Sequence, residues 1–173
     1  MRRPLYDSIC ANVTEHQKRT KDEAELMRLC LDYGLCSKAD VIAWADREIE
    51  TCDAPDPAVI DVALATRATT QDLLDLLAAV PGTSDVVSAR AMFLGRVADA
   101  LRHAPDTLPE VVRVLRRVAL CGDAPDERAS HAMRTLENDY ELVVYAGRPE
   151  TELRQRILTF LDEQAARAGR QTR

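Results

Sequence analysis

Apolar residues recur at helical spacing along most of the chain, and short polar or proline-containing segments separate the runs. The first strong run has the i, i+3, i+4, i+7 pattern of one helix face: Leu26, Leu29, Cys30 and Tyr33. Thr20 and Glu23 have the spacing of a capping box, which predicts that this helix begins at Thr20. Gly34 is typical of the residue after a helix end. A shorter helix is expected before it, from the spacing of Leu5, Ile9 and Val13.

Start and stop signals divide the rest of the chain into further helices. Residues that cap helix N-termini precede most of the apolar runs: Ser37, Asp56, Thr69 or Thr70, Ser84, Thr107 and Asp126. Glycine or proline ends them, as in Pro81-Gly82, Gly122 and Gly147. No segment alternates between apolar and polar residues for long enough to predict a strand. We therefore expect an all-α fold of about eight or nine short helices, arranged as an irregular orthogonal bundle or as an α-solenoid-like stack of helical hairpins.

The connections between these helices are short, so residues 1–173 are expected to form a single helical domain. Its ends, residues 1–20 and 166–173, are expected to be poorly ordered. The chain has two Phe, one Trp and four Tyr, so the core must be mainly aliphatic; we predict as core Leu29, Ile42, Trp44, Ile60, Leu64, Leu74, Leu77, Phe93, Val97, Leu115 and Leu136. Gly95 lies inside one predicted helix, where a glycine favours close packing against another helix.

The formal charge of −6 comes from one part of the chain. Residues 37–85 contain three basic and ten acidic side chains, whereas residues 1–36 balance and residues 86–173 carry a net charge of +1. This excess of acid disfavours general binding to nucleic acid, because phosphates attract basic surfaces. It favours instead a protein partner with a basic surface.

Six carboxylates of this acidic part fall within sixteen residues, with only Arg47 between them: Asp46, Glu48, Glu50, Asp53, Asp56 and Asp61. The spacing i, i+4, i+7 places Asp46, Glu50 and Asp53 on one face near a predicted helix end. Like charges there repel one another and oppose the helix dipole. We therefore take five of the six as candidate partner-binding residues: Asp46, Glu50, Asp53, Asp56 and Asp61. The alternative is an ordinary solvated acidic face.

No pattern in the chain predicts catalysis, a metal or a cofactor. His16, His103 and His131 are isolated from one another and from metal-ligand motifs. The six glycines are scattered rather than clustered before a helix, so no phosphate-binding loop is predicted. We expect no catalytic residue, no metal and no cofactor.

The cysteines and the N-terminus predict a cytoplasmic protein. The five cysteines are odd in number and irregular in spacing, which is typical of free thiols in a reducing compartment: Cys10, Cys30, Cys36, Cys52 and Cys121. Cys30 and Cys121 fall on apolar helix faces, where they would pack as small hydrophobes. No apolar region of a signal peptide follows Arg2 and Arg3, and no apolar run approaches the ~20 residues of a membrane span.

Two stretches, GLCSKADVIAWADREIE at 34–50 and PAVIDVAL at 57–64, resemble small helical bacterial proteins associated with polymorphic or contact-delivered toxins. The likeness is carried by Trp44-Ala45-Asp46 and by the segment IDVAL at 60–64. The resemblance implies an immunity-type protein that binds and blocks a cognate toxin. Such families diverge quickly at their binding surfaces, so the resemblance assigns no binding residue.

A non-enzymatic immunity-type inhibitor is therefore the leading hypothesis. Charge would steer it to a basic toxin, and its bulk would then cover the active site of that toxin. A secretion chaperone or adaptor for an effector protein is the alternative, and a large exposed apolar patch would favour it. An enzyme of unrecognised type is the third hypothesis, and a deep polar pocket would favour it.

Overall fold

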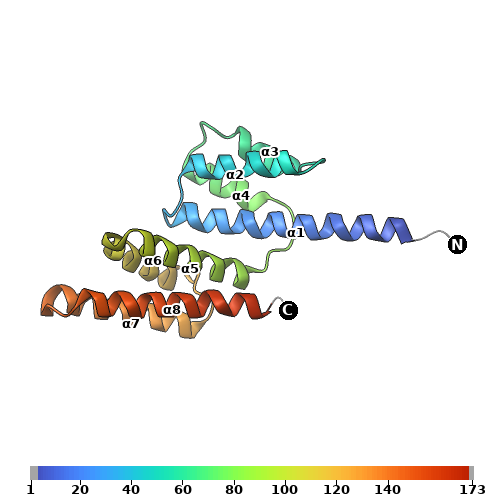
Figure 1. Ribbon diagram of the computed structural model, residues 1–173. Helices are drawn as coiled ribbons and strands as arrows, with labels where there is room; N and C mark the ends of the chain where they lie inside the picture. Colours follow the sequence, from blue (N-terminus) through green and yellow to red (C-terminus); the bar gives the residue numbers. More distant parts are fainter. Residues whose placement is uncertain (1–3, 172–173) are drawn as a thin grey trace. The chain divides into compact units, whose positions relative to one another are not determined.

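A computed structural model describes the backbone of residues 4–171 and the side chains of residues 15–167 (Figure 1). The described chain is all-α. Its contacts divide it into two compact units, a first unit over Met1–Ala89 and a second unit over Arg90–Arg173. A single domain over residues 1–173 stays a prediction. None of the described helices is both long enough and apolar enough to cross a membrane.

The first unit contains the helices α1 (Pro4–Asp32), α2 (Lys38–Thr51), α3 (Pro57–Leu64) and α4 (Thr70–Ala79), and the start of α5 (Val86–His103). In Figure 1, α2, α3 and α4 gather along the C-terminal half of α1. Helix α1 packs against α2 and α4. Helix α3 also packs against α2 and α4. Their apolar faces form one core: Ala24, Leu31, Val41, Trp44, Ala45, Val59, Val62, Leu73, Leu77 and Val80.

The prediction that a separate helix begins at Thr20 is wrong, because Thr20 lies inside α1. Helix α1 runs without a break from Pro4, and the predicted short helix is its first part, although the side chains of Leu5, Ile9 and Val13 lie outside the described residues. Thr20 is buried inside the helix, and its hydroxyl donates to Oε2 of Glu48 on α2 at 3.2 Å. A hydrogen bond that Thr20 donates to another helix thus takes the place of the predicted cap. The predicted buried face is confirmed: Leu26, Leu29, Cys30 and Tyr33.

The predicted starts at Ser37, Asp56 and Thr69 are confirmed by their hydrogen bonds. Ser37 and Thr69 form capping boxes with Asp40 and Asp72. Hydrogen bonds from the Ser37 side chain and backbone lower the pKa of Asp40, and those from Thr69 lower the pKa of Asp72.

Helix α5 begins at Val86, so its N-cap lies one residue after the predicted cap at Ser84. Asp85 takes that role, because its Oδ1 accepts the backbone N–H of Ser88 at 3.1 Å. The predicted start at Asp126 is confirmed, since its Oδ1 accepts the N–H of Ala129 at 2.7 Å. At these five helix starts, the side chain of the cap residue accepts a backbone N–H two or three residues ahead.

The predicted core is confirmed at most positions and wrong at Leu64, which is 74% exposed. Helix α3 is short, and its buried face is set by Val59 and Val62. Leu64 follows Val62 by two positions, which turns its side chain away from that face. Three other predicted core residues are only half-buried: Ile42, Ile60 and Leu74.

The second unit contains the rest of α5, the 3-10 helix η1 (Pro105–Thr107), α6 (Leu108–Cys121), α7 (Glu127–Ala146) and α8 (Glu150–Gln171). Helix α7 packs against both α6 and α8. The largest fully buried side chains of the second unit are Phe93, Leu94, Leu101, Leu108, Leu115, Met133, Ile157 and Leu161.

Glycines of the second unit behave as the sequence predicts. A Cβ at Gly95 would lie 3.5 Å from the Cβ of Ala165 on α8, which is the expected close helix packing. Gly122 and Gly147 follow α6 and α7 with φ of 80° and 66°, a left-handed conformation that favours glycine. The prediction that Cys121 packs on an apolar helix face is wrong. Cys121 is exposed because it is the last residue of α6.

Candidate functional site

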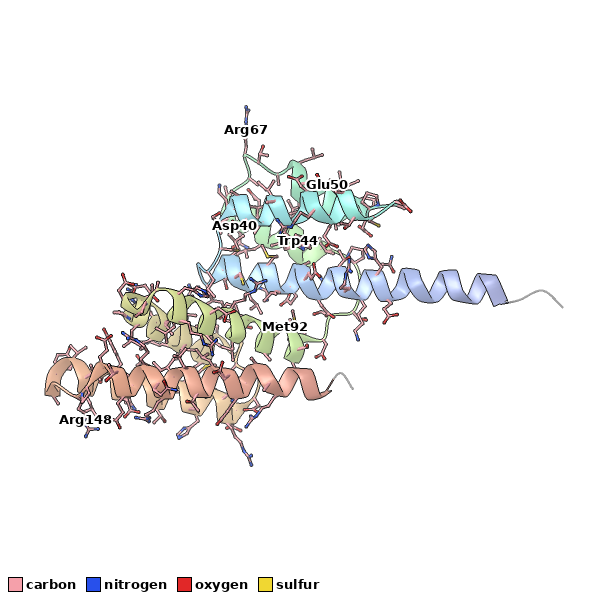
Figure 2. All side chains as sticks on the ribbon, in the orientation of Figure 1. Asp40, Trp44, Glu50, Arg67, Met92 and Arg148 are labelled. Carbon is pink, nitrogen blue, oxygen red and sulfur yellow. The ribbon has the colours of Figure 1, made fainter. Side chains whose placement is uncertain are left out.

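The candidate site begins on α2, a helix with one buried and one acidic side. Val41, Trp44 and Ala45 are buried. The indole N–H of Trp44 donates to Oε2 of Glu23 on α1 at 3.2 Å, which fixes the rotation of α2 against α1. Asp46 and Glu50 remain exposed, one helical turn apart. Figure 2 labels Glu50 and Trp44 on this helix. The buried face therefore decides which carboxylates reach solvent.

The end of α2 adds to the negative charge at this place. The helix ends at Thr51, whose hydroxyl donates to the carbonyl of Arg47 at 2.9 Å. Its last turn has no basic side chain to offset the negative end of the helix dipole, and Glu50 lies within that turn. Asp53 follows in the exposed turn toward α3.

Two more predicted residues belong to α3. Asp56 is its N-cap, and its Oδ1 accepts the backbone N–H of Ala58 at 2.9 Å. Its carboxylate therefore has a structural role. Asp61 is exposed, and Leu64 follows it by three positions, so the two share a side of the helix.

The predicted residues thus lie on two packed helices and the turn between them, which we call the acidic corner: Asp46, Glu50, Asp53, Asp56 and Asp61. Within the described part of the chain, no hydrogen bond or ion pair involves the side chains of Asp46, Glu50, Asp53 or Asp61. Glu48, between them in sequence, differs: it accepts the Thr20 hydroxyl and lies 4.0 Å from Nη2 of Arg19. Four carboxylates of the corner therefore have no hydrogen-bond or ion-pair partner among the described residues.

A cavity of about 400 Å³ lies at the acidic corner. Asp53 and Asp56 line it from the turn, Glu48 from α2, and His16 and Thr20 from α1. Three carboxylates beside an imidazole suit a cationic group, such as a guanidinium or an ammonium. No sequence pattern indicates this cavity, because His16 precedes Asp46 by thirty positions and only the packing of α1 against α2 brings them together.

Two observations concern metal binding and thiol reactivity among the described residues. No three His, Cys, Asp or Glu side chains among them gather as a metal ion would require. Burial, aided by the neighbouring Cys30 and Asp40, raises the pKa of the Cys36 thiol to about 12. Cys36 is therefore protonated at neutral pH and is a poor nucleophile.

Comparisons with protein-family models, with curated proteins and with solved structures found no significant match to this chain. The resemblance to immunity-type proteins therefore stays a hypothesis. The acidic corner, by its geometry and charge, is the feature of this chain that bears on function.

Proposed function

We propose that this chain is a non-enzymatic protein-binding module, and specifically an immunity-type inhibitor that docks a basic toxin on its acidic corner. One observation carries the proposal: Asp46, Glu50, Asp53 and Asp61 are exposed and have no hydrogen-bond or ion-pair partner in the described part of the chain. A basic partner can pair with them without breaking any intramolecular contact. It also relieves the repulsion between them and the effect of the α2 dipole.

The corner combines a rigid base with an apolar contact. The buried faces of α2 and α3 hold both helices in one core, so docking requires little ordering of the backbone. Leu64 is 74% exposed and shares a side of α3 with Asp61. An apolar side chain next to charges is the usual composition of a protein interface, where the anchor supplies affinity and the charges supply orientation.

Binding would proceed in two stages. The acidic corner first raises the rate of encounter with a basic surface, an effect that salt weakens. A lysine or arginine of the toxin then enters the cavity lined by Glu48, Asp53 and Asp56, while Leu64 packs against an apolar neighbour. The bound inhibitor covers the active site of the toxin by its bulk, and no bond is made or broken.

The test uses the product of the neighbouring gene as the partner and the double reversal E50K/D53K as the variant. We expect the variant to keep its circular dichroism spectrum, because exposed charges contribute little to stability. Its association rate should fall about tenfold at low salt and lose most of its salt dependence. Toxicity of the partner in co-expressing cells should reappear.

A matched control is D106K/E141K in the second unit, which changes the net charge equally at exposed carboxylates outside the acidic corner. It should associate nearly as fast as the parent. Equal rates for the parent and E50K/D53K at both salt concentrations would show that the corner is only a solvated face.

One observation favours the alternative, a secretion chaperone. Leu142, Val144 and Tyr145, near the end of α7, are exposed by 40%, 55% and 86%. A chaperone would bind an unfolded segment of its effector through such apolar side chains, whereas an immunity-type inhibitor binds the folded toxin domain. The chaperone hypothesis predicts that this chain binds the unfolded partner more tightly than the folded one. The Tyr145→Ser variant should lose this preference, and E50K/D53K should retain it.

A further inference from the structure

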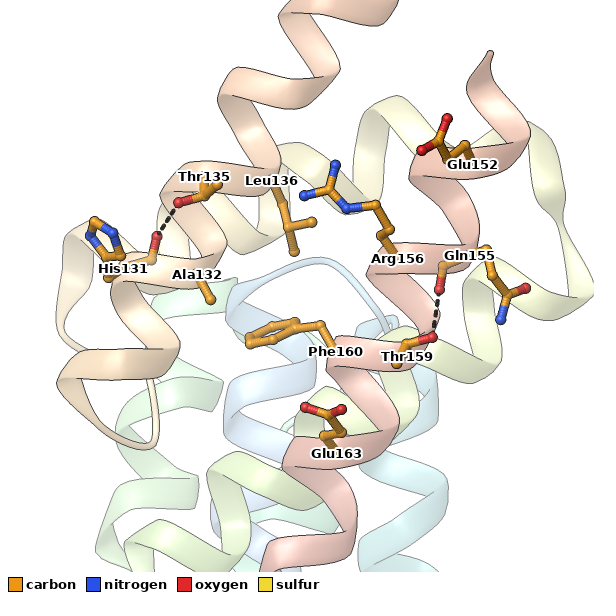
Figure 3. A pocket seen from close by; sticks show the side chains of 10 residues that line it. All are labelled: His131, Ala132, Thr135, Leu136, Glu152, Gln155, Arg156, Thr159, Phe160 and Glu163. Carbon is orange, nitrogen blue, oxygen red and sulfur yellow. Dashed lines mark hydrogen bonds between the residues drawn. The ribbon is translucent and has the colours of Figure 1, made fainter. Parts of the chain in front are cut away.

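A second concave surface lies within the second unit, between α7 and α8. It is a groove of about 730 Å³, which we call the α7–α8 groove. Ala132 and Leu136 line it from α7 and Phe160 from α8. Figure 3 shows Leu136 and Phe160 pointing into the space between the two helices.

Three polar side chains of the groove, Thr135, Arg156 and Thr159, have partners within the second unit. The hydroxyls of Thr135 and Thr159 donate to the carbonyls of His131 and Gln155 at 3.1 and 2.9 Å, shown as dashed lines in Figure 3. Both threonines can therefore offer their methyl groups. Nη2 of Arg156 lies 2.7 Å from Oδ2 of Asp139, which neutralises the guanidinium and leaves its aliphatic stem as lining. The middle of the groove is therefore apolar in character.

The two glutamates of the lining are separated along α8. Glu152 and Glu163 are eleven positions apart, or about 16 Å along a helix. Both are exposed, and neither side chain makes a hydrogen bond or ion pair to any described residue. The α7–α8 groove thus has a free negative charge toward each end of its α8 side and an apolar floor between them.

We infer that the α7–α8 groove binds an amphipathic α-helix of a partner protein, with a basic side chain at each end of an apolar stripe about three turns long. The side chains on the floor offer no free donor row for an extended peptide backbone. The occupant must therefore satisfy its own backbone hydrogen bonds, as a helix does. Its apolar side chains at i, i+3 or i+4 and i+7 contact Leu136 and Phe160. Its two basic side chains pair with Glu152 and Glu163.

The test uses two fluorescent synthetic peptides, each a helix with the same leucine stripe. One carries lysines eleven positions apart at the ends of the stripe, and the other carries glutamates there. Fluorescence anisotropy should show that the parent protein binds the lysine peptide about tenfold tighter than the glutamate peptide. The variant E152K/E163K should reverse this preference.

Two controls separate the groove from the rest of the surface. E50K/D53K and D106K/E141K change the net charge by the same amount and should bind the lysine peptide nearly as the parent does. Their result also keeps this inference distinct from the proposed function, which only E50K/D53K should impair. Ala132→Trp, which fills the floor and should preserve the melting curve, should weaken both peptides.

Three outcomes would overturn the inference. The first is binding of neither peptide, or of both equally. The second is an equal loss in E152K/E163K and E50K/D53K, which would indicate attraction by net charge alone. The third is a dimer in size-exclusion chromatography that E152K/E163K abolishes, because the occupant would then be a second copy of this chain.

Discussion

The carboxylates of the two units have different surroundings. In the second unit many face an arginine, as in Arg90–Asp123, Arg116–Glu137 and Arg156–Asp139, at 3.0, 3.1 and 2.7 Å. In the first unit the carboxylates of the acidic corner have no such partner among the described residues. Composition explains the contrast, because residues 37–85 have three basic side chains for ten acidic ones, and Lys38 donates to the carbonyl of Ala68 instead.

This difference shows that charged side chains on helices can stabilise contacts between helices in one unit and remain exposed without such contacts in another. The first unit is held by its apolar core and its capped helix starts, and four carboxylates of its acidic corner have no hydrogen-bond or ion-pair partner among the described residues. The second unit uses much of its charge internally, between helices. If that interpretation is right, removal of charge should affect the two units in opposite ways, while removal of core volume should affect them alike.

The largest effect is expected in the cores, where the units should not differ. Leu77→Ala and Leu115→Ala should each lower the free energy of unfolding by about 2–5 kcal/mol, because both side chains are fully buried. Leu74→Ala should cost less, about 1–2 kcal/mol, because Leu74 is half-buried. Chemical denaturation measures the losses, and hydrogen exchange assigns each to its unit. A loss below about 0.5 kcal/mol at Leu77 would contradict the core described above.

The second effect tests the internal ion pairs. Arg90 donates to Asp123 and to the carbonyl of Ala124, so Arg90→Met should cost about 1–2 kcal/mol. The control is Arg47→Met in the first unit, where no hydrogen bond or ion pair joins the guanidinium to a described residue. Arg47→Met should change the stability by less than about 0.5 kcal/mol. Similar losses for both variants would remove the contrast between the units.

A smaller effect should differ in sign between the units. Glu50→Lys should raise the free energy of unfolding by about 0.3–1 kcal/mol, because it turns repulsion from Asp46 into attraction and suits the end of α2. Glu137→Lys should lower it by about 0.5–1 kcal/mol, because Glu137 pairs with Arg116. Thermal melts at low and high salt measure both, and salt should shrink both changes. Changes of the same sign would refute the comparison.

The smallest effect concerns how the free energy of unfolding changes at acidic pH. The folded pKa values of Asp40 and Asp72 lie below the unfolded value of ~3.9, so their contribution is present above that pH and lost as pH falls through the folded pKa. D40N/D72N should therefore be less stable than the parent at pH 7 and lose less stability on acidification below pH 4. D46N/D61N is the control, because these two carboxylates make no hydrogen bond to any described residue. Parallel pH profiles for the parent and D40N/D72N would contradict the capping role.

The sequence by itself determined the features that depend on neighbours along the chain. The starts at Ser37, Asp56, Thr69 and Asp126 need only a side chain that reaches an N–H two or three residues ahead. The all-α class follows from a period that repeats within each helix. The acidic excess of residues 37–85 is a matter of counting.

The tertiary structure alone decided the features that depend on distant partners. Thr20 is inside a helix, and its hydroxyl donates to Glu48 on another helix instead of capping a helix start. Leu64 is exposed because α3 uses Val59 and Val62 to reach the core. The cavity beside Asp53 needs α1, and the α7–α8 groove needs two helices that pack through small and apolar side chains. Periodicity gives the faces of a helix, but only packing chooses which face is covered and which charges stay without a partner.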